Sequence, residues 1–302
     1  MDLISIKRKY RNIRNVIIAI SIVILIIILI IVFKEVAQNR RFEKVYTLYG
    51  KLIQQAQEDE QIKLEEKKAQ EEAERKAKLP QLTEEGKNNL ANIYSSESKR
   101  VFLTFDDGPS KKVTTAILDI LKQENVKATF FLLGSRVELY PEIVKRQYDE
   151  GDFLASHGYS HVYTQLYASP QSVLDEHNKC MAAIRNAIGE QEYNSHLFRF
   201  PGGYTGGKYA QIKEQASQLL EQNETLHVDW NALTADSAGA TTTEEFITEL
   251  EKTVPDDSDS DSVIVLMHDA GNKITTAEAL PTIIQYFRDR GFEFENFYSI
   301  IK

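Results

Sequence analysis

The sequence predicts an α/β protein in which about seven β/α units form a barrel. From residue 99 onward, short apolar runs alternate with longer amphipathic stretches, as is typical of helices packed around a parallel sheet. These units fill residues 99–302, a length that fits one barrel better than two domains. A doubly wound open sheet is the alternative. Nucleotide binding has no support, because neither a G-x-G-x-x-G nor a P-loop motif occurs.

Each predicted strand is a short apolar run of mainly Val, Ile, Leu and Phe. The strands are expected at 101–105, 128–133, 153–156, 197–200, 226–230, 263–268 and 292–298. The predicted helices carry apolar residues at helical spacing, and two of them begin at a proline, which is favoured there. They are expected at 112–123, 141–150, 170–188, 209–222, 243–254 and 277–288. A short extra helix is expected over 83–94, with Thr83 as its N-cap.

A membrane-crossing segment is expected near the N-terminus. Residues 16–33 form an uncharged run of 18 residues, long enough for the roughly 30 Å hydrocarbon core of a bilayer. Five basic residues precede this run, which favours a cytoplasmic N-terminus and an extracellular C-terminal part. We therefore expect a cytoplasmic basic flank over 1–14 and an uncleaved, single-pass transmembrane anchor over 15–34, in the cell membrane. A cleaved signal peptide is the alternative.

Residues 35–98 are expected to form a charged helical stalk and linker. Up to residue 79 the segment is rich in Glu, Lys, Gln and Ala, lacks proline and has one glycine, which suits an exposed helix with many ion pairs. Val45, Leu48 and Leu52 suggest a stripe for pairing with another helix. The stripe fades after Ile62, so a sustained coiled coil is not expected.

The charge distribution argues against nucleic acid as a partner. The formal charge is −9, and residues 1–34 carry six basic residues and one acid, so the remainder of the chain carries −14. Such an acidic region does not attract a phosphate backbone. The one cysteine, Cys180, excludes an internal disulfide and fits either a cytosolic protein or an exported protein that folds without disulfides.

Reactive side chains stand at or near the C-terminal ends of five of the predicted strands. They are Asp106 and Asp107, His157 and His161, Arg199, Asp229, and His268. In a β/α barrel the C-terminal ends of the strands carry the active site. Five such strand ends in one chain are hard to obtain by chance, so we expect these side chains to form one site.

The aspartate pair and the histidine pair suit a metal centre. Like charges as close as Asp106 and Asp107 push their pKa values apart unless a cation intervenes, so one is expected to hold a metal while the other acts as a base. His157 and His161 would complete a three-ligand site with an open position. Zinc is the expected metal, with cobalt, manganese or iron as alternatives. Taken singly, the aspartates also fit a surface turn, and the histidine spacing also arises by coincidence.

Arg199 lies on an apolar strand and needs an anionic partner if it is buried. The aspartate left free by the metal would serve, and a surface arginine is the alternative. After Pro201, the N–H groups of Gly202 and Gly203 suit an oxyanion hole, because glycine lets bare backbone approach a ligand.

His268 follows a strongly apolar strand and stands where a general acid would protonate a leaving group. Asp229 is expected to fix its tautomer and keep it charged. A core histidine is the alternative. Trp230 and Leu266 either line an apolar substrate pocket or belong to the core.

Together these motifs resemble the polysaccharide deacetylases of carbohydrate esterase family 4, the NodB-homology domain. The matching segments are 104–109 (TFDDGP), 157–161 (HGYSH), 199–203 (RFPGG), 228–230 (VDW) and 266–268 (LMH). The resemblance covers about residues 99–302 and implies that this part is a catalytic domain with a distorted (β/α)7 barrel. It also implies a divalent metal, often zinc.

The resemblance implies a role for each site residue. Asp106 would be the general base, held by Arg199, and His268 the general acid, tuned by Asp229. The implied metal ligands are Asp107, His157 and His161.

One position departs from the family pattern. The family often has a tyrosine after the proline of the third motif, and here Gly202 stands there. The backbone N–H remains available to an oxyanion, but the side-chain contact with substrate is lost, and Tyr204 is a candidate to compensate.

We therefore expect a membrane-anchored, outward-facing hydrolase that removes the acetyl group from N-acetylglucosamine residues of peptidoglycan and releases acetate. Its expected partners are a cell-wall glycan or another N-acetylated polysaccharide, and the membrane. The alternatives are a deacetylase of a secreted poly-N-acetylglucosamine or chitin-like polymer, a catalytically silent wall-binding barrel, and a glycoside hydrolase with two carboxylates.

Overall fold

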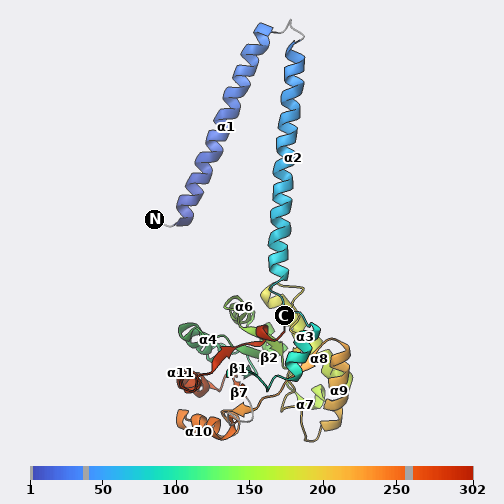
Figure 1. The fold of residues 1–302 in the computed structure, drawn as a ribbon, viewed down its shortest axis with the longest axis vertical. Helices are drawn as coiled ribbons and strands as arrows, with labels where there is room; N and C mark the ends of the chain where they lie inside the picture. Colours follow the sequence, from blue (N-terminus) through green and yellow to red (C-terminus); the bar gives the residue numbers. More distant parts are fainter. Residues whose placement is uncertain (1–2, 37–40, 256–260, 302) are drawn as a thin grey trace. The chain divides into compact units, whose positions relative to one another are not determined.

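The computed structural model describes residues 3–36, 41–255 and 261–301, and the chain divides into two compact units, Met1–Ala77 and Lys78–Lys302. The first unit contains two long helices, α1 (Leu3–Val36) and α2 (Arg41–Lys76) (Figure 1). Within α1, Tyr10–Lys34 is long and apolar enough to cross a membrane, a test that a signal sequence also passes. The part of the predicted stalk at 37–40 lies outside the described residues.

Helix α2 has the solvated character that its composition predicts. Ion pairs one helical turn apart line its surface, among them Lys67–Glu71 at 3.6 Å and Arg75–Glu72 at 2.6 Å. Such pairs each add a few tenths of a kcal/mol, about 0.2–0.5, to an exposed helix.

The second unit is built on a parallel sheet. Its strands are β1 (Arg100–Asp106), β2 (Thr129–Leu132), β3 (Phe153–Ser156), β4 (Leu197–Phe198), β5 (Leu226–His227), β6 (Ala232–Leu233), β7 (Ser262–His268) and β8 (Glu293–Glu295). The order across the sheet is β5-β4-β3-β2-β1-β7-β6, with β8 paired to β1. The two ends of this order, β5 and β6, do not pair, so the sheet curls without closing. The predicted α/β barrel is confirmed in this distorted form.

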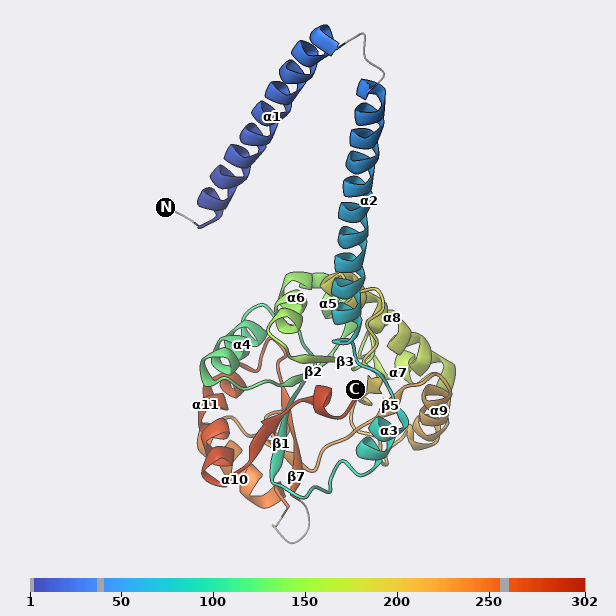
Figure 2. The same cartoon turned by 45° about the horizontal axis from the view of Figure 1, so that its top comes forward.

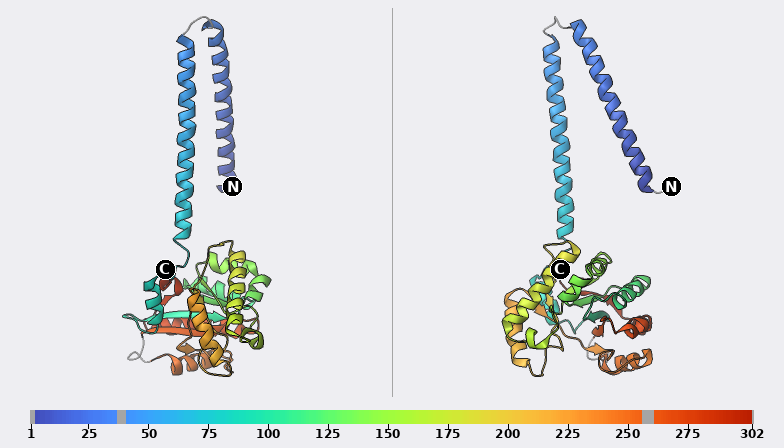
Figure 3. Two further views of the ribbon diagram at one scale, coloured as in Figure 1. Left: turned by 90° about the vertical axis from the view of Figure 1, so that its right-hand side faces the viewer. Right: turned by 180° about the vertical axis from the view of Figure 1, so that it is seen from behind.

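Helices surround the sheet (Figure 2), and the same arrangement can be followed from two other sides in Figure 3. They are α3 (Glu84–Ala91), α4 (Val113–Glu124), α5 (Gly134–Leu139), α6 (Pro141–Asp149), α7 (Tyr163–Leu166), α8 (Pro170–Ile188), α9 (Ala210–Gln222), α10 (Thr243–Thr253) and α11 (Ile274–Asp289). Capping residues fix the N-terminal ends of several helices. Thr242 and Glu245 form a capping box at α10, and Ser169 caps α8.

The strands bury both faces. In β1, Val101 and Leu103 pack with the helices in the large outer core, whereas Phe102 belongs to a second cluster on the opposite face. This alternation follows from the two-residue period of a strand. The second cluster also holds Leu90 and Ile93, which are 6% and 2% exposed.

The folded domain therefore begins earlier than expected. We placed 35–98 in the stalk and linker, but the compact unit starts at Lys78. The reason is α3 and the turn after it, whose apolar side chains complete the second core cluster. Thr83 caps α3 as predicted, accepting a hydrogen bond from the Gly86 N–H.

The register of the sheet brings the reactive strand ends together. Asp106, the last residue of β1, pairs in register with His268, the last residue of β7. On the other side of β1, β2 and β3 follow in parallel, and Ser156 at the end of β3 pairs with Phe198 of β4. Side chains at and just after these residues therefore share one edge of the sheet.

Candidate active site

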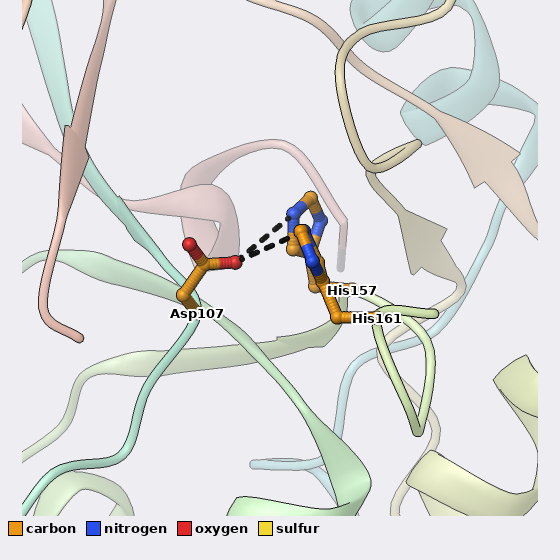
Figure 4. A group of neighbouring side chains, drawn as sticks. All are labelled: Asp107, His157 and His161. Atoms are coloured by element: carbon orange, nitrogen blue, oxygen red, sulfur yellow. Dashed lines mark ion pairs between the residues drawn. The ribbon is translucent and has the colours of Figure 1, made fainter. Parts of the chain in front are cut away.

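Three side chains with metal-ligating atoms meet at this edge. The Oδ1 atom of Asp107 lies 3.6 Å from Nε2 of His157 and 3.3 Å from Nε2 of His161. One ligand atom from each residue lies within 4.8 Å of the others, and Figure 4 shows the carboxylate facing both rings. A tetrahedral zinc ion separates its ligand atoms by roughly 3.4 Å, so the three residues fit such an ion.

The backbone and the burial of Asp107 also suit a cation. Asp107 and His161 have φ values of +76° and +58°, a region that costs a residue other than glycine about 1–3 kcal/mol and is concentrated at functional sites. The Oδ1 atom of Asp107 is buried and has no hydrogen-bond partner among the described residues. A buried carboxylate oxygen without a partner is costly, and a cation would supply the partner.

The ring of His157 is held in a neutral form that could bind a metal. Its Nδ1 lies 2.8 Å from the backbone oxygen of Arg199, and because that oxygen only accepts, Nδ1 carries the proton. The lone pair of Nε2 then faces Asp107. Burial lowers the pKa of His157 to about 3, so the ring stays neutral even in mild acid.

Asp106 differs from the three predicted ligands in its ion pair with Arg199, although its Oδ2 also lies 3.7 Å from Nε2 of His157. Its Oδ1 accepts a hydrogen bond from Nη1 of Arg199 at 2.9 Å, and the two side chains are 3% and 0% exposed. Burial raises the pKa of Asp106 above its usual value, with Arg199 opposing the shift. A carboxylate whose pKa moves toward neutrality is suited to accept a proton.

Arg199 is fixed from several sides. Its guanidinium donates to Oγ1 of Thr104 at 2.7 Å and to the backbone oxygens of Val228 and Asp229 at 3.2 and 3.1 Å. The ring of Phe131 lies 3.9 Å below it, a cation–π contact. Each buried donor that is satisfied reduces the cost of burying the charge. Asp106 is thus the anionic partner that a buried Arg199 is expected to need.

His268 is held by Asp236. Its Nδ1 lies 2.8 Å from Oδ1 of Asp236, and its backbone N–H donates to Oδ2 at 2.8 Å. Thr276 also donates to Oδ2, at 2.9 Å. Burial acts to lower the pKa of His268, but the hydrogen bond and charge of Asp236 outweigh it, so the pKa lies above its ordinary value. His268 therefore tends to keep a proton on Nε2, the ring nitrogen that points away from Asp236.

The expectation that Asp229 fixes His268 is wrong. The Asp229 carboxylate instead accepts the backbone N–H of Tyr204, at 3.0 Å to each oxygen, and so holds the turn after Arg199. The physical reason is the chain path: β5 ends at His227, before Asp229, and Asp236 follows the separate strand β6.

The turn at 201–203 lies between aromatic side chains. Gly202 and Gly203 have φ values of +76° and +75°, which glycine adopts without strain. A Cβ atom on Gly203 would lie 3.2 Å from the ring of Trp230, so Trp230 covers one side of the turn. The backbone oxygen of Pro201 accepts from the hydroxyl of Tyr167 at 2.7 Å.

The other two residues predicted to contact substrate, Leu266 and Tyr204, pack against protein side chains. Leu266 is buried in β7, with 8% of its surface exposed. Tyr204 packs against His227, with ring centroids 4.1 Å apart and the two rings tilted by 33°.

Sequence reasoning also missed Asp269. This fully buried carboxylate accepts from Oγ1 of Thr114 at 2.6 Å and sits against Gly108, where a Cβ atom would lie 2.0 Å from its Oδ2. Burial raises the pKa of Asp269 to about 7. Its position next to His268 at a strand end was the available signal.

Comparisons with known proteins agree with this geometry. A family model described as polysaccharide deacetylase matches residues 94–219. A peptidoglycan-N-acetylglucosamine deacetylase of Bacillus cereus is 30% identical over 221 residues, which cover 72% of this chain and 76% of that protein. A protein of the same name from Listeria monocytogenes is 34% identical over 197 residues, covering 65% of this chain but 38% of that protein.

A solved structure extends the likeness to the fold. A CE4 esterase of Streptococcus mutans superposes with a TM-score of 0.63 at 32% identity, covering 69% of this chain and 90% of that chain.

Proposed function

Because this chain belongs to the polysaccharide deacetylase family, we propose that it removes the acetyl group from N-acetylglucosamine residues of peptidoglycan. The observation that carries the proposal is the arrangement at one sheet edge. Three ligating side chains lie beside a buried carboxylate, Asp106, and close to a histidine held by a second carboxylate.

The metal-binding residues in this proposal are Asp107, His157 and His161. A divalent cation at such a site supplies Lewis acidity toward water and toward the acetamide carbonyl. Zinc suits two imidazoles and one carboxylate with an open position, and cobalt or manganese are alternatives.

The chain's own residues move the protons. Asp106, kept in place by Arg199, accepts the proton of the attacking water, whose oxygen bonds to the carbonyl carbon. His268 gives its proton to the amide nitrogen as the C–N bond breaks, so the products are acetate and a free amino sugar. Asp236 supports this step because it accepts the N–H of Nδ1 of His268, and its charge favours the second proton of the ring, on Nε2. The N–H of Gly202 contributes to the oxyanion hole.

The substrate follows from topology. An apolar helix near the N-terminus, with basic residues before it, favours a single-pass anchor and an extracellular domain. The cell wall is then the nearest N-acetylated polymer. A secreted poly-N-acetylglucosamine is the second candidate, and the acidic charge disfavours nucleic acid.

The test is product analysis with the full chain in detergent micelles. Purified peptidoglycan and poly-N-acetylglucosamine are each incubated with the protein, and acetate, free amines and new reducing ends are measured. The proposal expects acetate and free amines in equal amounts, more from peptidoglycan, and no new reducing ends. New reducing ends would indicate a glycoside hydrolase, binding without any product would indicate a silent wall-binding protein, and full activity after metal removal would contradict the metal-dependent reaction.

A further inference from the structure

The hydroxyl of Tyr163 occupies the space above Gly202. A Cβ atom on Gly202 would lie 2.7 Å from Oη of Tyr163 and 3.4 Å from its Cζ. The first distance is shorter than real Cβ contacts allow, so the phenol fits in this place because residue 202 has no side chain. The Tyr163 hydroxyl thus fills the space that a side chain at residue 202 would need.

The ring of Tyr163 is held beside the predicted ligands. It begins α7, two residues after His161, and meets the His161 ring at a centroid distance of 5.4 Å. Behind it, Tyr167 makes an edge-to-face contact at 5.6 Å. Tyr167 in turn donates its hydroxyl to Pro201, which ties α7 to the turn that carries Gly202.

The Tyr163 hydroxyl has unused hydrogen-bonding capacity. Among the residues that the structure describes, none makes a hydrogen bond with this oxygen, and the residue is 39% exposed. Tyr204, the expected substitute for a side chain at 202, packs instead against His227. An aromatic ring with a free hydroxyl at the rim of a site suits a sugar, which offers hydroxyl and acetamide groups to the phenol.

We propose that Tyr163 contacts the substrate and sets its specificity, by a hydrogen bond from its hydroxyl to the N-acetylated sugar unit bound beside the proposed metal site of Asp107, His157 and His161. This inference rests on the proposed function. It assigns to α7 the side-chain contact that the turn at Gly202 does not provide, and it makes Gly202 a requirement for that contact.

The first experiment measures binding and turnover separately for Tyr163→Phe in the full chain. The probes are a short N-acetylglucosamine oligomer and an aryl acetate, which has no sugar. Loss of one hydrogen bond is expected to weaken oligomer binding and raise its KM about tenfold, with kcat within about twofold and kcat/KM for the aryl acetate unchanged. The control is Tyr140→Phe, which removes a hydroxyl between α5 and α6 and should match the wild type.

Several results would overturn the inference. They are equal oligomer binding by wild type and Tyr163→Phe, equal losses on both substrates, and absence of oligomer binding by the wild type. A wild type that binds the oligomer and loses affinity on Tyr163→Phe, yet releases no acetate, would instead contradict the proposed function and leave the contact supported.

A double-mutant cycle tests the dependence on Gly202. In Gly202→Ala the new Cβ atom displaces the Tyr163 hydroxyl, so oligomer binding should weaken about as much as in Tyr163→Phe. In the double variant the backbone strain of alanine is unchanged but no hydroxyl remains to be displaced, so its affinity should be close to that of Tyr163→Phe alone. Fully additive losses would show that the two residues act independently.

Discussion

Asp236 binds His268 at two points, through Nδ1 of the ring and through the backbone N–H, each at 2.8 Å. The first contact fixes the tautomer, and the second fixes the end of β7 that carries the ring. Asp236 itself is held by Thr276, so the pair forms a short chain of buried hydrogen bonds. In such a chain the charge of Asp236 acts on His268 with little screening by water.

Asp236→Asn should therefore lower the pKa of His268, because Asp236 contributes most among the carboxylates that raise it. With a lower pKa, less of the histidine is protonated at neutral pH. The alkaline limb of the kcat/KM profile should move to lower pH, and activity at pH 8 should fall about tenfold or more. The measurement is acetate release from pH 5 to 9.

Asp229→Asn is the matched comparison, because Asp229 holds the backbone of Tyr204 and not His268. It should reduce activity without moving the alkaline limb. A shift of the alkaline limb in Asp229→Asn, with none in Asp236→Asn, would show that Asp229 controls the pKa of His268, as the sequence predicts.

The neighbouring aspartates should fail in different ways. Asp106→Asn keeps the size of the side chain but cannot accept a proton, so turnover should fall about 100-fold or more while metal binding is kept. Asp107→Asn removes a charged ligand, so metal affinity itself should fall about tenfold or more. Metal content after dialysis, measured alongside acetate release, separates the two. Equal metal loss in both variants would contradict the separate roles.

How much of the site was predictable depended on strand boundaries. The sequence predicts that Asp107, His157 and His161 lie together, as they do, because their motifs are local and follow strands that the sequence marks well. The expectation for Asp229 is wrong because the apolar run at 226–230 predicts one strand, whereas β5 ends at His227. The two-residue strand β6 has too few residues to show a period, so the true strand end before Asp236 was hidden.

The start of the folded domain, at Lys78 and not at residue 99, was also hard to predict. Leu90 and Ile93 are apolar residues in a mainly polar segment. Only Leu90 lies in the eight-residue helix α3, so the two do not form a recognisable helical pattern. Their burial depends on the second core cluster, which includes Phe297 and Ile301 from the far end of the chain. A contact between segments so distant in the sequence leaves no local signal.

The burial of Ile93 gives a stability prediction. Ile93→Ala should lower the free energy of unfolding of the folded domain by about 2–4 kcal/mol, because a buried branched side chain leaves a cavity. The control is Ile62→Ala on α2, which is 52% exposed and should change stability by less than about 0.5 kcal/mol. Denaturant unfolding of the full chain in detergent measures both. Equal, small effects would mean that the segment before β1 belongs to the stalk after all.

Asp152 predicts a pH dependence of stability. This carboxyl, 1% exposed, accepts the N–H of Ala128 at 2.9 Å, and burial raises its pKa from the ordinary value of 3.8 to about 7. Because the folded state holds the proton more tightly than the unfolded state, ionisation of Asp152 destabilises the protein progressively as the pH rises from about 4 to about 7. Asp152→Asn keeps the hydrogen-bond acceptor without a charge. Its stability relative to the wild type should rise across this window, by on the order of a few kcal/mol, and then level off. Thermal unfolding at pH 4.5, 6 and 8 measures the difference, with the exposed Asp175→Asn as control; a constant difference at all three values would show that Asp152 ionises normally.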